Sequence, residues 1–196
     1  MTDQWRSRRD ILKQAGIVGV LGISGCLGDG EDSPPSGRQV TDLTVTGADS
    51  APVSITATAT HAQITSEQTA QFELTVTGQR DDPVSLTFGN SIPFSYPQRS
   101  TPSGLVLMPG DYMEDKSQQT WLAPTEIPRP LPLLGVNDLT AGDSITREWN
   151  VLGDPDHVSY IEPGTYNFTT ALTGKSLDDP IEWTLSVTIA TGSTEE

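Results

Sequence analysis

The sequence predicts an all-β protein whose strands form a two-layer antiparallel sandwich. From residue 53 onward, apolar and polar residues alternate in short segments, which is the period of a strand with one buried face. These segments are rich in threonine and are separated by turns that contain proline and glycine. No segment shows sustained helical spacing, and this combination is typical of an antiparallel β-sandwich.

Six segments carry the strand pattern and together supply the residues of a core. In the second of them, Phe72, Leu74 and Val76 fall on one face, and residues 78–83 then predict a turn. The last segment has the longest alternation, with five apolar residues on one face. The predicted strands are 53–58, 70–77, 84–88, 145–151, 166–172 and 181–189.

A proline-rich insertion separates the third predicted strand from the fourth. Residues 91–132 contain eight prolines. Within them, residues 105–108 and 120–122 are candidates for short edge strands, since proline is tolerated beside an edge but not inside a central ladder. Two interpretations stay open. A long excursion on a rigid scaffold can be a recognition surface, or it can be a loop that covers an edge of the sheet.

A tyrosine near the end of the chain favours an immunoglobulin-like (Ig-like) sandwich. Tyr166 follows the turn formed by Pro163 and Gly164, and Phe168 stands two positions further on. In Ig-like domains a tyrosine at this place enters the penultimate strand, and its hydroxyl bonds to the backbone of the preceding corner. We therefore predict that Tyr166 is a structural corner residue. This role concerns the scaffold and implies no function.

Two parts of the chain resemble the BsuPI-type intracellular proteinase inhibitor domain. The similar stretches are 71–78 and 83–91, for its opening strands, and 139–149 and 163–166, for its closing half. Residues 92–137 depart from the family pattern, because only residues 119–122 stand for its aromatic-rich segment. The resemblance implies a β-sandwich and an inhibitor-like module that would present a protruding loop, within residues 92–132, to a protease.

The N-terminus has the features of an export signal. Arg8 and Arg9 form a positively charged flank, and a Gly-rich apolar run of ten residues follows at 15–24. This run is too short to cross about 30 Å of hydrocarbon, which takes about twenty residues, and it has the length of a signal-peptide core. Paired arginines mark the route that exports folded proteins. The alternative is a short amphipathic helix at the start of a cytosolic domain.

Cys26 is the only cysteine, and it ends a tetrad, Ile-Ser-Gly-Cys, that resembles a lipobox. A lone thiol in an exported protein is either a free reactive group or a modified one. Its position after the apolar run favours lipidation, and two acyl chains suffice for stable anchoring. The predicted organisation is a signal peptide over 1–25, a lipidated cysteine and flexible acidic linker over 26–50, the sandwich over 51–191, and a disordered tail over 192–196.

The charge of the chain limits its partners. Removal of residues 1–25 takes away two acidic and four basic residues, which leaves 24 acidic and 7 basic residues and moves the net charge from −15 to −17. Such a surface has no basic patch for nucleic acid, so we expect no nucleic-acid partner. Repulsion of this size is tolerable where salt screens it. With its leader, the chain resembles a cell-surface lipoprotein of a halophilic archaeon; an acidic exported bacterial protein is the alternative.

Catalytic chemistry is not indicated. The chain lacks a nucleophile elbow and a phosphate-binding glycine loop, so we predict no enzyme, no catalytic residue and no cofactor. His61, His157, Met108 and Met113 lack the close spacing of a copper site. The loop at 154–157 could hold a hard cation, although Asp-Pro is first a turn signal. We therefore assign no metal site.

Asn167 begins the only Asn-x-Ser/Thr tripeptide and is a candidate N-glycosylation site, because the strand pattern places it opposite Tyr166 and Phe168. The expected protein is anchored by lipid to the extracellular face of the cytoplasmic membrane. It would act as a binding module for a protein partner, either a protease or an envelope component. The alternatives are a purely structural envelope lipoprotein and a metal-binding surface protein.

Overall fold

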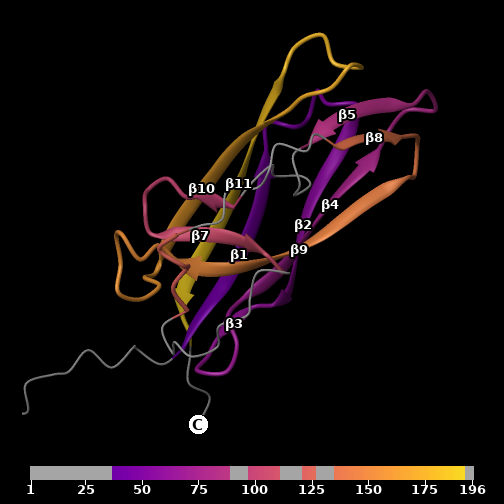
Figure 1. Ribbon diagram of the computed structural model, residues 1–196. Helices are drawn as coiled ribbons and strands as arrows, with labels where there is room; N and C mark the ends of the chain where they lie inside the picture. The colour runs from indigo at the N-terminus through magenta and orange to yellow at the C-terminus, as the bar shows by residue number, and fades with distance from the viewer. Residues whose placement is uncertain (1–36, 89–96, 111–120, 127–134, 193–196) are drawn as a thin grey trace, which may run out of the picture. The chain divides into compact units, whose positions relative to one another are not determined.

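A computed structural model describes residues 37–88, 97–110, 121–126 and 135–192 (Figure 1). They form an antiparallel β-sandwich, so the predicted fold class is confirmed. The predicted signal residues Arg8, Arg9 and Cys26 lie outside the described residues. The eleven described strands are β1 (Arg38–Thr46), β2 (Val53–His61), β3 (Gln63–Ile64), β4 (Gln71–Gly78), β5 (Val84–Phe88), β6 (Gln98–Arg99), β7 (Leu105–Pro109), β8 (Gly135–Leu139), β9 (Ser144–Gly153), β10 (Gly164–Leu172) and β11 (Ile181–Thr191).

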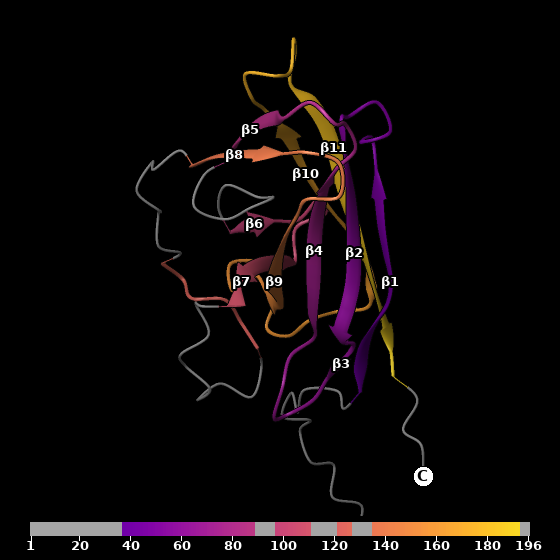
Figure 2. The ribbon, with the colours of Figure 1, turned by 90° about the vertical axis from the view of Figure 1, so that its right-hand side faces the viewer.

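The strands form two main sheets and one short pair. Sheet A has the order β10-β11-β1-β3, and sheet B has the order β2-β4-β9-β7-β6. Strands β5 and β8 pair with each other (Figure 2). All of these strand pairs are antiparallel.

The core lies between the inner faces of the two sheets, where the predicted alternation places it. Phe72, Leu74 and Val76 of β4 are buried, and β11 buries every second residue from Trp183 to Ile189. Each such side chain contributes about 1.5–3 kcal/mol when it leaves water. The largest fully buried side chains, Trp149, Trp183, Phe72 and Phe168, come from both sheets and belong to one apolar cluster.

On both sides of the sandwich, a segment of the chain passes from one sheet to the other. After β2 in sheet B, the chain continues into β3 in sheet A, and the Val40 amide donates to the Ala62 carbonyl at 2.8 Å. On the other side, the segment after β6 reaches β10, where Thr101 and Asn167 exchange two backbone hydrogen bonds of 2.8 and 2.9 Å. These crossings cover parts of edges that would otherwise expose unpaired backbone groups.

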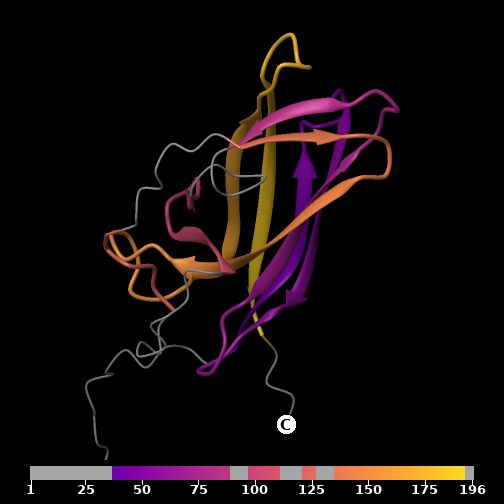
Figure 3. The same cartoon turned by 45° about the vertical axis from the view of Figure 1, so that its right-hand side comes forward.

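One end of the sandwich is closed by the β5–β8 pair, which continues the β4–β9 pair beyond a sharp corner (Figure 3). At this corner the Gly78 amide donates to the Asp143 carbonyl at 2.9 Å, and the Gly142 amide donates to the Gly78 carbonyl at 3.1 Å. The backbones approach so closely that a Cβ on Gly78 would lie 2.1 Å from the Thr140 carbonyl oxygen. Glycine is required here because of space.

The predicted flexible linker over 26–50 is wrong for residues 38–46, which form β1. This strand pairs with β11 along its length and with β3 at its first two residues only, so the rest of β1 forms an edge of sheet A. A register shift between Val40 and Asp42 interrupts its alternation, so Val40 and Leu43 are three positions apart although both contribute to the core. Because of this bulge, the strand does not show the period-two alternation by which strands are predicted from a sequence. The sandwich therefore begins near residue 37 rather than 51.

The insertion also differs from the prediction. The sequence predicts an edge strand over residues 105–108, but β7 lies between β9 and β6 in sheet B, and all five of its residues are buried. The second expected strand, 120–122, contributes an isolated bridge between Leu122 and Gly153. The described part of the insertion is therefore built into sheet B by β6 and β7, and its Thr101 also covers part of the β10 edge of sheet A.

Candidate functional site

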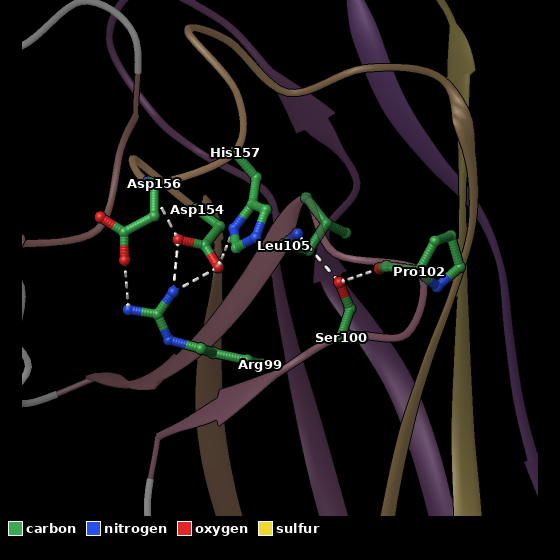
Figure 4. A network of polar contacts seen from close by, with 7 residues as sticks. All are labelled: Arg99, Ser100, Pro102, Leu105, Asp154, Asp156 and His157. Carbon is green, nitrogen blue, oxygen red and sulfur yellow. Dashed lines mark hydrogen bonds and ion pairs between the residues drawn. The ribbon is translucent and has the colours of Figure 1, made fainter.

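The insertion is fastened to the sandwich at the end of β9, and this attachment is the most developed polar site in the described residues (Figure 4). Asp154 follows β9 directly, and its side chain is 1% exposed. Its amide donates to the Gly104 carbonyl at 3.0 Å, next to the β7–β9 pairing of Leu105 with Gly153. The backbone thus places a buried carboxylate beside the β6–β7 hairpin.

Arg99, the last residue of β6, binds this carboxylate. Its Nη1 donates to both oxygens of Asp154, at 2.6 and 2.5 Å, and its Nη2 lies 3.1 Å from Oδ2 of Asp156. A guanidinium is suited to such multiple contacts because its donors form a rigid planar fork. The Arg99 side chain is 40% exposed while Asp154 is buried, so the ion pair is solvated on one side only.

The remaining acceptor positions of Asp154 are filled from its own turn. The Asp156 amide donates to Oδ1 at 3.2 Å, and Nδ1 of His157 lies 3.1 Å from Oδ2. The turn itself is closed by hydrogen bonds from the amides of His157 and Val158 to the Asp154 carbonyl. Because Arg99 occupies the place where a cation would bind, the cation alternative for residues 154–157 has no support in this geometry.

The other arm of the insertion returns to the same place. The Gly153 amide donates to the Trp121 carbonyl at 2.8 Å, and the Ala123 amide donates to the Gly153 carbonyl at 2.8 Å. The Trp121 indole donates to the Thr65 carbonyl at 2.5 Å. Trp121 has a φ of 50°, which is uncommon for a bulky residue and persists only where the surroundings hold it. Gly153 and Asp154 therefore hold both arms of the insertion.

The tip of the β6–β7 hairpin is also ordered by side-chain contacts. The Ser100 hydroxyl donates to the Pro102 carbonyl at 2.7 Å and accepts from the Leu105 amide at 3.0 Å. The next residue, Thr101, makes the two bonds to Asn167 that join the sheets. The hairpin is consequently held from within, by Ser100, and from both sheets.

Tyr166 lies beside this hairpin and makes the contact that a corner tyrosine makes. Its hydroxyl donates to the Glu162 carbonyl oxygen at 3.1 Å, four residues upstream. The ring packs against the backbone of Gly104, where a Cβ would lie 2.9 Å from Cε1. Burial, and then the charge of Glu162, raise the pKa of Tyr166 above its ordinary value.

Replacing Tyr166 by phenylalanine should lower the free energy of unfolding by about 1 kcal/mol at neutral pH, because the Glu162 carbonyl loses its donor. Since the pKa of Tyr166 is raised in the folded state, its contribution is complete below the unfolded pKa of about 10 and is lost as pH rises through the folded value. Urea unfolding between about pH 7 and 11 should therefore show a steeper loss in the wild type than in Tyr166→Phe. Parallel losses would contradict this role.

Asn167, the candidate glycosylation site, lies in the middle of β10 on the outer face of sheet A. It is half-buried rather than fully exposed. Its Oδ1 accepts a hydrogen bond from the Ser186 hydroxyl at 2.7 Å, and its backbone is paired with Thr101. These contacts use the Oδ1 atom and the backbone of Asn167, not Nδ2, the atom to which a glycan would be attached. Glycosylation of Asn167 therefore stays a prediction.

The residues of the copper alternative are not brought together. His61 lies on β2 and Met108 on β7, with β4 and β9 between them in sheet B. Three strand spacings separate them by about 14 Å, which is too far for a shared ion. His157 contacts Asp154 instead, and Met113 lies outside the described residues. Among the described residues, no three His, Cys, Asp or Glu side chains form a group that could hold a metal.

Arg99 is the site residue that the sequence did not reveal. It lies 55 positions from Asp154, and no local pattern relates the two. A second unforeseen feature is a polar chain on the outer face of sheet B, in which Gln68 donates to Gln71 at 2.9 Å and Gln71 donates to Asn150 at 2.8 Å. Asn150 is 1% exposed although its strand position predicts exposure. The ion pair depends on the β6–β7 hairpin of the insertion, and Asn150 pairs with Met108 of the same hairpin.

Comparison with known proteins adds one finding. A protein family described as "Domain of unknown function (DUF8130)" matches residues 6–98, from the predicted leader to the first residue of β6. No match was found among curated proteins or among solved structures. The described residues contain no helix with the length and apolar character needed to span a membrane.

Proposed function

We propose that this protein is a lipid-anchored β-sandwich at the extracellular face of the cytoplasmic membrane, and that it acts as a binding module for a protein partner. The observation that carries the binding role is the attachment of both arms of the insertion at Gly153 and Asp154. A loop with fixed ends loses less conformational entropy on binding than a free one. Binding sites on such folds are commonly carried by loops on a rigid scaffold.

The ends of the domain suit an anchor at Cys26. The Gly192 amide donates to the Gly37 carbonyl at 2.5 Å, so the chain enters and leaves the sandwich at the same end. Ten residues lie between Cys26 and Gly37, and such a segment reaches about 40 Å when extended. This length is enough to hold the whole sandwich clear of a lipid surface, with its insertion accessible.

The proposed partner class is a protease or an envelope component. Resemblance to the BsuPI-type proteinase inhibitor domain favours a protease. The alternative is a structural envelope lipoprotein. It is favoured by the outer face of sheet A, where cross-strand hydroxyl pairs such as Thr169–Thr184 at 2.9 Å and Thr165–Thr188 at 3.2 Å make a polar surface. A metal-binding role has no comparable support among the described residues.

Two measurements on the full chain separate the alternatives. A protease partner predicts that the purified protein inhibits at least one member of a panel of serine, cysteine and metallo-proteases. Arg99→Ala should then weaken inhibition, whereas Arg80→Ala, at an exposed position of the turn 78–83, should not. If the panel shows no inhibition and a pull-down from native membranes at high salt recovers only envelope components, the inhibitor role is contradicted and the structural role is supported.

Replacing Cys26 by serine is expected to abolish membrane association. Without the thiol no acyl chain can be attached, and each buried methylene contributes about 0.8 kcal/mol to anchoring. Fractionation of cells should move the protein from the membrane to the soluble fraction, and its mass should lose the diacylglyceryl group. Ser24→Ala, which keeps the thiol and a small residue, serves as the control. Membrane retention of Cys26→Ser would overturn the lipid anchor.

A further inference from the structure

Strand β2 is the outer strand of sheet B, and its free edge differs from the other sheet edges in the described residues. An exposed edge is a template for another chain, so proteins block edges with bulges, charges, short strands or covering segments. Strand β10 is covered by Thr101, and β6 is only two residues long. Strand β1 carries a bulge and the charged Asp42, and β8 is short and carries Asp138. Each of these edges uses a known device.

Strand β2 lacks such a device over most of its length. Residues 53–60 contain no charged residue, no proline and no glycine, and five of the eight are β-branched. One side of the strand pairs regularly with β4 from Val53 to Ala59, and the first irregularity comes between Ala59 and His61. The next charged residue after β2 is Glu67. An uncharged, β-branched edge of this length favours pairing with a further strand.

We propose that β2 pairs antiparallel with β2 of a second copy of this chain, so that the two B sheets join into one continuous sheet across a two-fold axis. Such an interface is self-complementary, because each copy contributes the same strand. The interface needs no feature beyond the backbone groups of the edge and the side chains beside it.

The distribution of charge favours a second copy of the chain as the partner of β2. The chain is strongly acidic, so two copies can approach only where charge is absent. Beside the first part of β2, two rows of hydroxyl side chains cross sheet B: Ser54, Thr77 and Ser144 in one, and Thr56, Thr75 and Thr146 in the other. The next row pairs Thr58 with Glu73 and Glu148, and it marks the limit of this uncharged zone. A basic partner would instead be attracted to the acidic turns. The uncharged zone therefore suits a second copy.

Acidic residues near the start of β2 favour antiparallel pairing of the two β2 strands. Asp49 precedes the start of β2, and Asp81 and Asp82 lie on the neighbouring turn, where the Gln79 amide donates to the Pro52 carbonyl at 3.0 Å. Parallel pairing would bring these acidic ends together, and like charges placed opposite each other are destabilising. Antiparallel pairing places them at opposite ends of the dimer.

Cysteine trapping tests this arrangement, because Cys26 is the only native cysteine. In the full chain carrying Cys26→Ser, single substitutions Ser54→Cys, Thr56→Cys and Thr58→Cys place a thiol along β2. Across a two-fold axis an outward residue faces either its own copy or an outward neighbour at another position of the second copy. One of the three variants, or one equimolar mixture of two of them, should therefore form a disulfide dimer at least about tenfold faster than the others. Thr146→Cys is the matched control, because Thr146 is exposed on the same hydroxyl row but lies two strands away from the edge.

Sedimentation of the Cys26→Ser chain supplies an independent readout. Salt screens the repulsion between two acidic copies, so the dissociation constant should fall by about tenfold between about 0.1 M and 1 M KCl. The proposal is overturned by cross-linking of the β2 variants at the rate of Thr146→Cys, or by a monomer at every salt concentration. Both readouts use unlipidated protein and no protease, so neither depends on the proposed anchor or binding role.

Discussion

Replacing Arg99 by alanine is expected to lower the free energy of unfolding by about 3 kcal/mol, because it leaves the carboxylate of Asp154 buried without a counter-charge. This value lies at the low end for buried ion pairs, since the Arg99 side chain is 40% exposed and its charge is partly solvated. Urea unfolding of the full chain at constant salt measures the change. Arg80→Ala, an equal truncation on an exposed turn, should change stability by less than about 0.5 kcal/mol.

The order of effects distinguishes an ion pair from simple loss of packing. Asp154→Ala should cost less than Arg99→Ala, because the arginine left behind can turn toward solvent while the carboxylate cannot. The double variant should cost clearly less than the two single losses added together. Additive losses would mean that Arg99 and Asp154 stabilise the domain independently. Arg99→Lys should retain part of the stability, since an ammonium keeps the charge but cannot make the planar two-oxygen contact.

This ion pair shows where prediction from the sequence stops. Strands β4, β5 and β11 could be predicted nearly residue by residue, because their alternation is uninterrupted and one face of each is buried. The turn at 154–157 was also visible, from its Asp-Pro pair. The burial of Asp154 was not, because it depends on a hairpin that folds against β9 from a distant part of the chain.

The missed strand β1 has a different cause. Its composition, with Asp42 and several threonines after an acidic Gly-Pro-rich segment, resembles the linker that precedes it. The bulge between Val40 and Asp42 then breaks the alternation that would have distinguished the strand from the linker. In both cases the deciding information is a pairing between residues far apart in the chain. A local pattern can give a strand's buried face but not its neighbours.

Replacing Gly78 by alanine is expected to lower the free energy of unfolding by about 3 kcal/mol, because the new Cβ would lie 2.1 Å from the Thr140 carbonyl oxygen and 2.8 Å from its carbon. Both are backbone atoms, so no side-chain rotation can relieve the contact. The two strands would have to separate at the corner, which would lengthen the hydrogen bonds that join Gly78 to Asp143 and Gly142. Thermal and urea unfolding should both report the loss.

Gly142→Ala is the control that separates space from backbone conformation in the same corner. Gly142 has a φ of 88°, and a Cβ added there would meet no atom within 4 Å, so alanine at this position is strained but does not collide. That strain costs about 1–2 kcal/mol. If Gly78→Ala proves no worse than Gly142→Ala, close approach does not limit this corner. The larger expected loss at Gly78 would instead show that the β5–β8 pair can close the end of the sandwich only because two backbones meet without a side chain between them.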